Sequence, residues 1–304
     1  MSKAALYDEI GGPDVLYIGE VPDAAPGPGE VAVRVGAAGL NPYDAKVLSG
    51  AIPTKASFPR RIGGDLAGTV EAVGEGAVYA DGTPIEVGDE VLGRAAGAIS
   101  ERVIAAASDL ARRPAALPVD VAGGLYVAGL TAVTVLDTLP VDSRDTVLIG
   151  GAAGGVGFIA AQLAVATGAR VIGTASARNH DLLRSLGIEP LTYGDDLATR
   201  VAALGAPTAV YDCHGRDALD AGIALGLSPQ RMVAIAAGPA GDELGVRTAG
   251  REARTAVNLS ILAARVAAGE IVVPVSASYP LDQVAAAFTA LGRAHAPGKV
   301  IVTP

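Results

Sequence analysis

The stretch from Thr146 to Gly168 constrains the fold of this chain more than any other. Its first four residues, Thr146–Ile149, form a short apolar run rich in β-branched residues, typical of a buried parallel strand. A glycine cluster follows, and then Ala, Leu and Val at helical spacing. In the pattern G-x-G-x-x-G the three positions fall on Ala152, Gly154 and Gly157, so the first is alanine. A strand, a tight glycine turn and a helix together predict a dinucleotide-binding unit rather than a loose loop.

The next strand ends without the carboxylate that an NAD enzyme uses to bind the ribose hydroxyls. The residues from Thr174 to Asn179 read Thr-Ala-Ser-Ala-Arg-Asn, and the first acidic residue after this strand is Asp181. Ser176 can donate a hydrogen bond, and Arg178 offers a planar guanidinium suited to a phosphate dianion. This combination favours NADPH over NADH. The alternative is that Arg178 is a solvated arginine at the start of a helix.

The whole chain excludes several classes of protein. With 304 residues it is long enough for two domains, and its net charge of −9 argues against nucleic-acid binding. No run approaches the ~20 apolar residues of a membrane span, and no signal peptide is visible. The single cysteine, Cys213, fits a reducing compartment. We therefore expect a cytoplasmic protein that binds neither a membrane nor nucleic acid.

Two kinds of pattern divide the chain. Short strand-like runs with frequent glycine fill the first 118 residues and predict a small barrel. A helix is expected over Val119–Leu139, and strands then alternate with helices, which predicts a parallel sheet. The expected strands after the glycine turn are Arg170–Ala175, Pro190–Tyr193, Ala209–Asp212, Arg231–Ala236 and a sixth strand near Leu244–Thr248.

The last part of the chain changes pattern again. We expect a helix over Thr255–Ala268, a strand at Ile271–Val275, a helix from Leu281 to about Arg293 and a closing strand at Gly298–Val302 that returns to the first domain. The predicted domains are therefore residues 1–118 with 269–304, and residues 119–268 between them. The predicted fold class is α/β, with a doubly wound parallel sheet of Rossmann type and a β-barrel domain.

Seven motifs in this order resemble the medium-chain dehydrogenase/reductase superfamily, and within it the zinc-independent quinone oxidoreductases and alkenal/enone reductases. The resemblance implies a GroES-like catalytic domain around an NADPH-binding Rossmann domain, with the cofactor between them, and a possible homodimer. The motifs are Gly39–Asp44, Gly64–Gly68, Val87–Val91, Gly129–Ala132, Ala152–Gly157, Gly173–Arg178 and Gly298–Val302.

The chain departs from the zinc alcohol dehydrogenases at their metal ligands. Asn41 stands near the position of a cysteine ligand, and Asp65 stands where that branch has histidine. The three histidines, His180, His214 and His295, fall in the nucleotide-binding half or the tail. A tetrahedral zinc site is not expected from these residues, so the enzyme should work without a metal.

Site residues are carried over from the resemblance. Asn41, Asp44 and Lys46 are expected near the substrate, because Asn-Pro-x-Asp-x-Lys is similar to the enone-reductase branch. Tyr43 either faces the same site or packs against the protein. The alternative for Asn41–Asp44 is a purely structural role, as an Asx-type turn that closes a loop.

A second set of residues is expected at the cofactor. Thr131 should approach the nicotinamide, and Tyr193 should lie near the adenosine 2′-phosphate or merely cover a strand end. The remaining cofactor-binding residues are predicted to be Ala153, Gly154, Gly155, Val156, Thr174, Ser176 and Arg178.

The resulting prediction is an NADPH-dependent, metal-independent oxidoreductase that reduces quinones or α,β-unsaturated carbonyls by hydride transfer. Its partner is a small-molecule quinone or enone. The alternatives are an enoyl-thioester reductase of a biosynthetic pathway, with the same chemistry, and a non-catalytic NADPH-binding protein.

Overall fold

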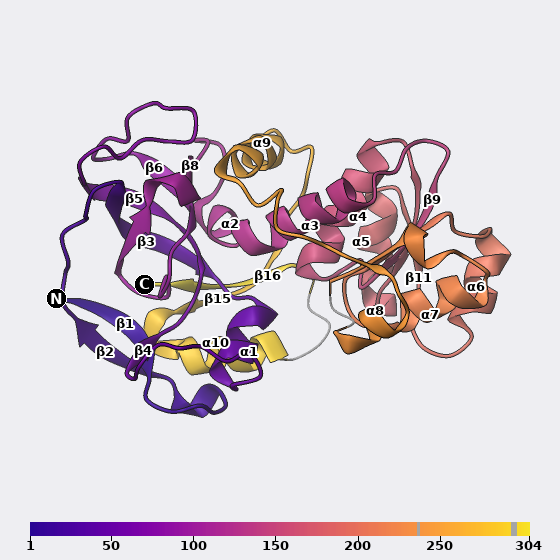
Figure 1. The fold of residues 1–304 in the computed structure, drawn as a ribbon, viewed down its shortest axis with the longest axis horizontal. Helices are drawn as coiled ribbons and strands as arrows, with labels where there is room; N and C mark the ends of the chain where they lie inside the picture. The colour runs from indigo at the N-terminus through magenta and orange to yellow at the C-terminus, as the bar shows by residue number, and fades with distance from the viewer. Residues whose placement is uncertain (236–237, 293–296) are drawn as a thin grey trace. The chain divides into compact units, whose positions relative to one another are not determined.

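The computed structural model describes residues 1–235, 238–292 and 297–304 of the chain. They form two compact units: of the described residues, unit 1 comprises 1–128, 255–292 and 299–304, and unit 2 comprises 129–235, 238–254 and 297–298 (Figure 1). The sequence predicts domain boundaries at 118/119 and 268/269. In the structure, helices α2 (Val119–Gly123) and α9 (Ala256–Ala267) both pack on strands of unit 1 and are counted with it.

Unit 1 is built mainly of antiparallel strands. In its described residues the larger sheet has the order β15-β16-β3-β5-β6-β8, with β7 also paired to β3, and a smaller sheet has the order β2-β1-β4. Val31, Val33 and Val35 of β3 are buried in one hydrophobic core, as alternate residues on one face of a strand are expected to be. Ala32, on the other face, is buried as well, so this strand is covered more fully than its alternating sequence predicts. The strands are β1 (Ser2–Tyr7), β2 (Tyr17–Val21), β3 (Glu30–Gly39), β4 (Arg60–Arg61), β5 (Asp65–Val73), β6 (Glu90–Arg94), β7 (Arg102–Ala106), β8 (Leu110–Arg112), β15 (Val275–Pro280) and β16 (Lys299–Thr303).

Short helices close the core of unit 1. Helix α10 (Val284–Gly292) buries Val284, Ala287 and Phe288, which share one face because they are three and four residues apart. The strand expected at Ile271–Val275 was misplaced: Ile271 and Val273 are buried, but the ladder begins at Val275. The expected end of the last helix, Arg293, lies outside the described residues. The other helices are α1 (Pro42–Leu48) and the 3-10 turns η1 (Pro13–Val15), η2 (Ala107–Asp109) and η5 (Leu281–Gln283).

Unit 2 contains the parallel sheet that the glycine turn predicts. Within the described residues its order is β11-β10-β9-β12-β13-β14, and every neighbouring pair is parallel. The central strand is β9, and the order reverses at it, which is the arrangement of a doubly wound fold. The strands are β9 (Thr146–Gly150), β10 (Arg170–Thr174), β11 (Ile188–Leu191), β12 (Ala209–Asp212), β13 (Met232–Ala234) and β14 (Arg247–Thr248). The expected end of the fourth strand, Ala236, lies outside the described residues.

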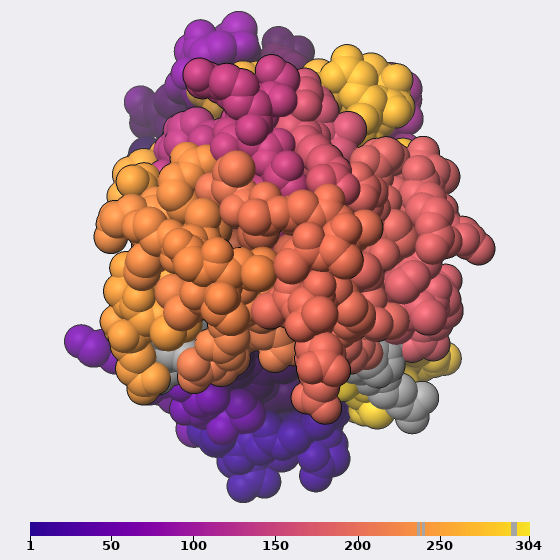
Figure 2. All heavy atoms as spheres, turned by 90° about the vertical axis from the view of Figure 1, so that its right-hand side faces the viewer, coloured from indigo at the N-terminus to yellow at the C-terminus, as the bar shows by residue number. Residues whose placement is uncertain are grey.

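Helices cover both faces of this sheet, because successive strand residues point to opposite sides. Val147 and Ile149 pack with α3 (Tyr126–Thr138), α4 (Gly155–Ala166) and α5 (His180–Ser185), and Leu148 packs with α6 (Leu197–Leu204) and α7 (Asp217–Ala224). The rose and orange residues that face the viewer in Figure 2 belong to this unit. Its remaining helices are η3 (Ala177–Asn179), η4 (Pro229–Arg231) and α8 (Pro239–Glu243).

One helix prediction was partly wrong. The helix expected over Val119–Leu139 is two helices, α2 and α3, separated by Gly124 and Leu125. Glycine is a weak helix former, which explains the break at this point. No helix in the described ranges is both long and apolar enough to cross a bilayer.

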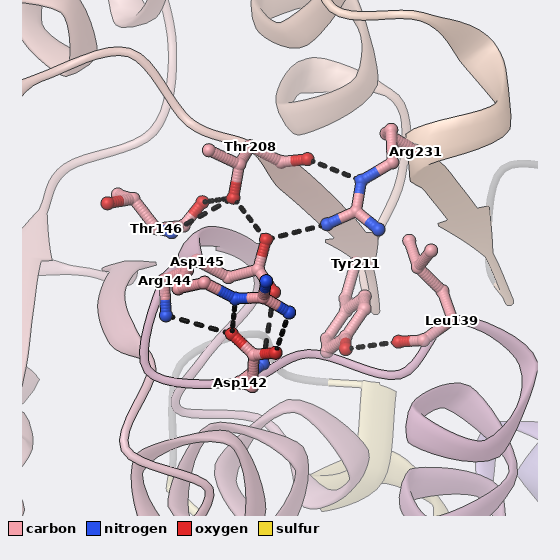
Figure 3. Close-up of polar contacts among 8 residues, drawn as sticks. All are labelled: Leu139, Asp142, Arg144, Asp145, Thr146, Thr208, Tyr211 and Arg231. Atoms are coloured by element: carbon pink, nitrogen blue, oxygen red, sulfur yellow. Dashed lines mark hydrogen bonds and ion pairs between the residues drawn. The ribbon is translucent and has the colours of Figure 1, made fainter.

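A polar network closes the amino-terminal edge of the sheet (Figure 3). Asp145 Oδ1 accepts hydrogen bonds from Arg231 Nη2 and from Thr208 Oγ1, each at 2.7 Å, and Arg231 Nε also donates to the Thr208 carbonyl. The Thr208 hydroxyl in turn accepts from Thr146 N at 3.0 Å. These contacts join the residues that begin β9 and β12 to the end of η4, at the opposite edge from the glycine turn.

Candidate functional site

The glycine turn lies between the carboxyl end of β9 and the start of α4. Gly151 has φ +70°, a conformation that favours glycine, and Gly154 is the residue that caps α4. A Cβ built on Gly157 would lie 2.3 Å from the Gly151 carbonyl oxygen, so a side chain there would force the helix away from the strand end. The close packing of helix on turn therefore depends on Gly157.

Thr174, at the end of β10, holds the turn from the side. Its hydroxyl accepts a hydrogen bond from Gly151 N at 3.0 Å, and its carbonyl accepts one from Ala152 N at 2.9 Å. The same strand explains why alanine, Ala152, is accepted at the first position of the G-x-G-x-x-G pattern. A Cβ on Gly173 would lie 2.6 Å from the Ala152 methyl, so glycine at 173 makes the room that this methyl occupies.

The open side of the turn has the properties of an anion site. Gly154 is exposed, and a Cβ added to it would meet only the Gly151 carbonyl oxygen, at 3.3 Å. The first helical hydrogen bond runs from Phe158 N to Gly154 O, which leaves the N–H groups of Gly155 and Val156 ahead of the helical ladder. N–H groups at the start of a helix, together with the helix dipole, favour a phosphate at this position. The residues present thus fit the pyrophosphate of a dinucleotide.

The residues expected around the adenosine lie on loops at the same edge of the sheet. Ser176 is half-buried after β10, and Arg178 is exposed beside it. Tyr193, after β11, is 41% exposed, and its ring centroid lies 6.5 Å from that of His214, after β12. Three successive loops therefore present hydrogen-bonding or aromatic side chains at the carboxyl ends of the strands, where ligands bind in such sheets.

Thr131 lies on α3 and is buried. Its hydroxyl accepts a hydrogen bond from Arg254 Nη2 at 3.1 Å. Sequence reasoning did not select Arg254. A hydroxyl that accepts a hydrogen bond from a guanidinium can still donate its own proton, so Thr131 can donate a hydrogen bond to a ligand.

Unit 1 contains a second, separate polar cluster, made where three neighbouring strands meet. Strand β3 runs antiparallel to both β16 and β5, so the end of β3 adjoins the starts of the other two. Lys299 begins β16 and Asp65 begins β5, and Leu40 and Asn41 follow β3. Lys299 Nζ donates to the Leu40 carbonyl at 2.8 Å and to Asn41 Oδ1 at 2.5 Å, and it lies 3.8 Å from Asp65 Oδ2.

Asp44 joins this cluster through the first turn of α1. Its Oδ2 accepts from Asn41 N at 2.8 Å, which is half of a capping box, and Asp44 N donates to the Asn41 carbonyl at 2.9 Å. Asp65 accepts from Val127 N with both carboxylate oxygens, each at 3.2 Å. Asn41, Asp44, Asp65 and Lys299 are all at most 5% exposed.

Burial controls the charges in this cluster. It raises the pKa of Asp44 to about 7, and the neighbouring Asp65 carboxylate acts in the same direction, against hydrogen bonds from Asn41 and the charge of Lys299. Burial lowers the pKa of Lys299, while Asp65 and Asp44 oppose the shift. Asp44 therefore exchanges its carboxyl proton near neutral pH. The cluster can thus hold a proton near neutral pH.

The structure places the four expected residues of α1 in two environments. Asn41 and Asp44 are buried and bonded to each other, whereas Tyr43 is 50% exposed and Lys46 is exposed. Residues 41, 44 and 48 share the inner face of the helix, and residues 43 and 46 do not. Sequence reasoning missed Lys299. Its signal was a lysine at the head of the otherwise apolar Lys299–Val302 run, where a charge needs buried partners.

The donor set of the chain does not fit zinc. Cys213 is the single cysteine, and burial raises the pKa of its thiol, which disfavours the thiolate that zinc requires. Across the residues that the structure describes, no three side chains of His, Cys, Asp or Glu gather as a metal site. His180 contacts the Ala175 carbonyl, His214 lies near Tyr193, and His295 lies outside the described residues.

Comparison with known proteins identifies the family. Residues 27–134 match the alcohol dehydrogenase GroES-like domain, and residues 155–267 match a domain described as zinc-binding dehydrogenase. A quinone oxidoreductase of Pseudomonas aeruginosa is 31% identical, and the match covers 100% of both chains. The chain belongs to the quinone oxidoreductases of the medium-chain dehydrogenase/reductase superfamily.

Two other matches bear on its chemistry. The structure of Escherichia coli quinone oxidoreductase complexed with NADPH superposes with a TM-score of 0.85 at 28% identity, covering 99% of this chain and 100% of that one. A Streptomyces orinoci protein of the spectinabilin polyketide synthase system is 32% identical over 95% of this chain, which spans 14% of that much longer protein. The expected α/β fold, with a GroES-like domain and a Rossmann-type sheet, is confirmed.

Proposed function

We propose that this quinone oxidoreductase family member is an NADPH-dependent, metal-independent enzyme that reduces quinones or α,β-unsaturated carbonyls. The observation that carries the proposal is the open glycine turn at the start of α4, which fits a pyrophosphate and is hydrogen-bonded to Thr174. Ser176 and Arg178 follow Thr174 in a stretch that has no Asp or Glu before Asp181. The Escherichia coli relative complexed with NADPH supports the same choice of cofactor.

In this proposal unit 2 holds the cofactor. The N–H groups at the start of α4 bind the pyrophosphate, Thr174 fixes the turn, and Ala153, Gly154, Gly155 and Val156 line it. Arg178, Ser176 and Tyr193 bind the 2′-phosphate, and Thr131 donates its hydroxyl proton to the ligand. NADPH, when bound, supplies the hydride.

Unit 1 supplies the groups that act on the acceptor. Reduction of a quinone or enone develops negative charge on the carbonyl oxygen, and a fixed hydrogen-bond donor stabilises it. Asn41 is the buried donor of the cluster, while Tyr43 and Lys46 are exposed on the same helix. Asp44 holds a proton at its carboxyl group near neutral pH. The proposal therefore assigns substrate contact to Asn41, Tyr43 and Lys46, and proton storage to Asp44.

An assay of NADPH and NADH consumption tests this proposal. The purified protein should oxidise NADPH in the presence of 1,4-benzoquinone or of trans-2-hexenal, and NADH much more slowly. Binding of NADPH without oxidation by any acceptor would instead identify a non-catalytic binding protein.

A second candidate is favoured by one observation, the match to a polyketide synthase protein over 95% of this chain. An enoyl-thioester reductase uses the same hydride chemistry on a thioester-activated double bond. Crotonyl-CoA in the same assay distinguishes the two: a kcat/KM far above that for quinones or enones would favour the thioester reductase.

A further inference from the structure

His214 is exposed at the carboxyl edge of the parallel sheet, with its ring beside that of Tyr193. The two ring centroids lie 6.5 Å apart and the ring planes are inclined by 41°, which is within the range of an aromatic pair. Tyr193 follows β11 and His214 follows β12, and β10 and β9 lie between these two strands in the sheet. Three strand spacings amount to about 14 Å, so the two loops bend towards each other across the carboxyl ends of β10 and β9. The ring pair therefore lies at the edge where ligands bind in such sheets.

The backbone that carries His214 is held against the glycine turn. Cys213 N donates to the Gly150 carbonyl at 3.1 Å, and Asp212 Oδ1 accepts from His214 N at 3.0 Å. A Cβ on Gly151 would lie 2.6 Å from the Cβ of His214, so the missing side chain at position 151 makes room for this residue. The imidazole thus begins directly beside the turn that is proposed to bind the pyrophosphate.

We infer that His214 is a base-stacking residue of the cofactor site, with the face of its imidazole against the adenine of the bound dinucleotide. This inference rests on the proposed function, because it names the part of the cofactor that the residue contacts. The 2′-phosphate is proposed to bind beside Tyr193, the neighbour of His214, and the adenine is attached to the same ribose as that phosphate. Bases stack on the flat ring of histidine as they do on those of Phe, Tyr and Trp.

The contact has a consequence for cofactor choice that differs from that of Arg178. Adenine occurs in both NADPH and NADH, so His214 should contribute equally to the binding of both. Arg178 is proposed to bind the 2′-phosphate, which NADH lacks. The residues that the stacking contact needs all belong to unit 2.

The first test compares His214→Ala with His214→Phe in titrations of NADPH and NADH. Both variants keep the Cβ that packs against Gly151. His214→Ala should weaken both cofactors by the same factor, at least about fivefold, equivalent to about 1 kcal/mol and the lower end for a base stacked on an aromatic side chain. His214→Phe should bind both within about twofold of the wild type, because a flat ring remains. Tyr17→Ala, at an exposed aromatic residue of unit 1, is the matched control and should bind as the wild type does.

Three outcomes of these titrations would overturn the inference. Wild-type affinities in His214→Ala would show that the ring contacts neither cofactor. A loss confined to NADPH would mean that the imidazole binds the 2′-phosphate rather than the base. A loss in His214→Phe as large as that in His214→Ala would mean that a ring nitrogen, and not the ring face, makes the contact.

The second test observes the imidazole directly by proton NMR. The chain has three histidines, so the His214 ring C–H resonances can be assigned as those that disappear in His214→Ala. On titration with NADP⁺ they should move upfield, as protons over the face of a base do because of its ring current. Resonances that stay in place when NADP⁺ is saturating would overturn the inference.

The inference and the proposed function fail in different ways. A wild type that binds NADPH but reduces no acceptor removes the proposed activity, and the two binding tests still decide the inference. A wild type that reduces an acceptor, with unchanged cofactor affinities in His214→Ala, overturns the inference alone. A wild type that binds neither NADPH nor NADH overturns both.

Discussion

Substitution by alanine should affect mainly stability at Gly157 and mainly NADPH binding at Gly154. A methyl group on Gly157 would lie 2.3 Å from the Gly151 carbonyl oxygen, 0.7 Å short of the 3.0 Å that real Cβ atoms keep. Overpacking of this kind costs about 1–3 kcal/mol, and the better helix propensity of alanine returns up to about 1 kcal/mol. The methyl would meet backbone atoms, which cannot rotate away, so the overpacking cost should lie in the upper half of its range, at about 2–3 kcal/mol. After about 1 kcal/mol is returned by helix propensity, we expect Gly157→Ala to lower the free energy of unfolding by about 1–2 kcal/mol.

Gly154→Ala is the matched comparison. The new methyl would meet only the Gly151 oxygen, at 3.3 Å, and the backbone at φ −79° accepts any residue. Stability should fall by less than about 1 kcal/mol, the usual range for a change at a helix N-cap. The methyl would, however, occupy the open side of the turn, so NADPH should bind at least about tenfold more weakly, equivalent to about 1.4 kcal/mol.

Urea unfolding followed by circular dichroism and a fluorescence titration with NADPH measure the two quantities for both variants. The reasoning is refuted if Gly154→Ala binds NADPH as the wild type does. It is equally refuted if Gly157→Ala is as stable as the wild type, because the packing of α4 on the turn would then tolerate a side chain.

Four further outcomes follow from the structure. Arg178→Ala should weaken NADPH by about ten- to a hundredfold, since a hydrogen bond to a charged group contributes about 1.5–3 kcal/mol, and should leave NADH unchanged in binding titrations. Asp44 has a folded pKa of about 7, above its ordinary value of 3.8, so the folded state binds more protons than the unfolded state between these pH values. The free energy of unfolding, measured with urea, should therefore fall as the pH rises from about 4 to about 7, and Asp44→Asn should remove this dependence. Arg231→Met should lower the free energy of unfolding by about 1–2 kcal/mol because Arg231 binds Asp145, whereas Arg144→Met, at a side chain 88% exposed, should change it by less than about 0.5 kcal/mol. Exhaustive chelation should leave the rate of NADPH oxidation unchanged.

Each of these outcomes has a clear opposite. Equal losses of NADPH and NADH affinity would mean that Arg178 does not bind the 2′-phosphate. If the free energy of unfolding of Asp44→Asn still depends on pH as in the wild type, another group titrates. If Arg231→Met and Arg144→Met have equal effects on the free energy of unfolding, the network of Figure 3 does not stabilise the fold. Activity lost on chelation and restored only by zinc would contradict metal independence.

Local patterns predicted the elements around the glycine turn well, because strand, turn and helix there are consecutive in sequence. The helix α1 was harder: Asn41–Asp44 was also compatible with a simple turn, and only the burial of Asp44 and Leu48 in the structure shows which face packs. Lys299 could not be joined to Asn41 from the sequence, because their contact spans 258 residues and depends on the pairing of β16 with β3.

The position of β16 has a consequence for the order in which the chain can fold. This strand lies inside the larger sheet, between β15 and β3, although it is translated after every residue of unit 2. Unit 2, in contrast, is nearly continuous along the chain. On a ribosome its sheet can therefore assemble while β3 still exposes the edge that β16 will cover. Completion of unit 1 is thus a late event in biosynthesis, and until then the edge of β3 remains open to pairing with other strands.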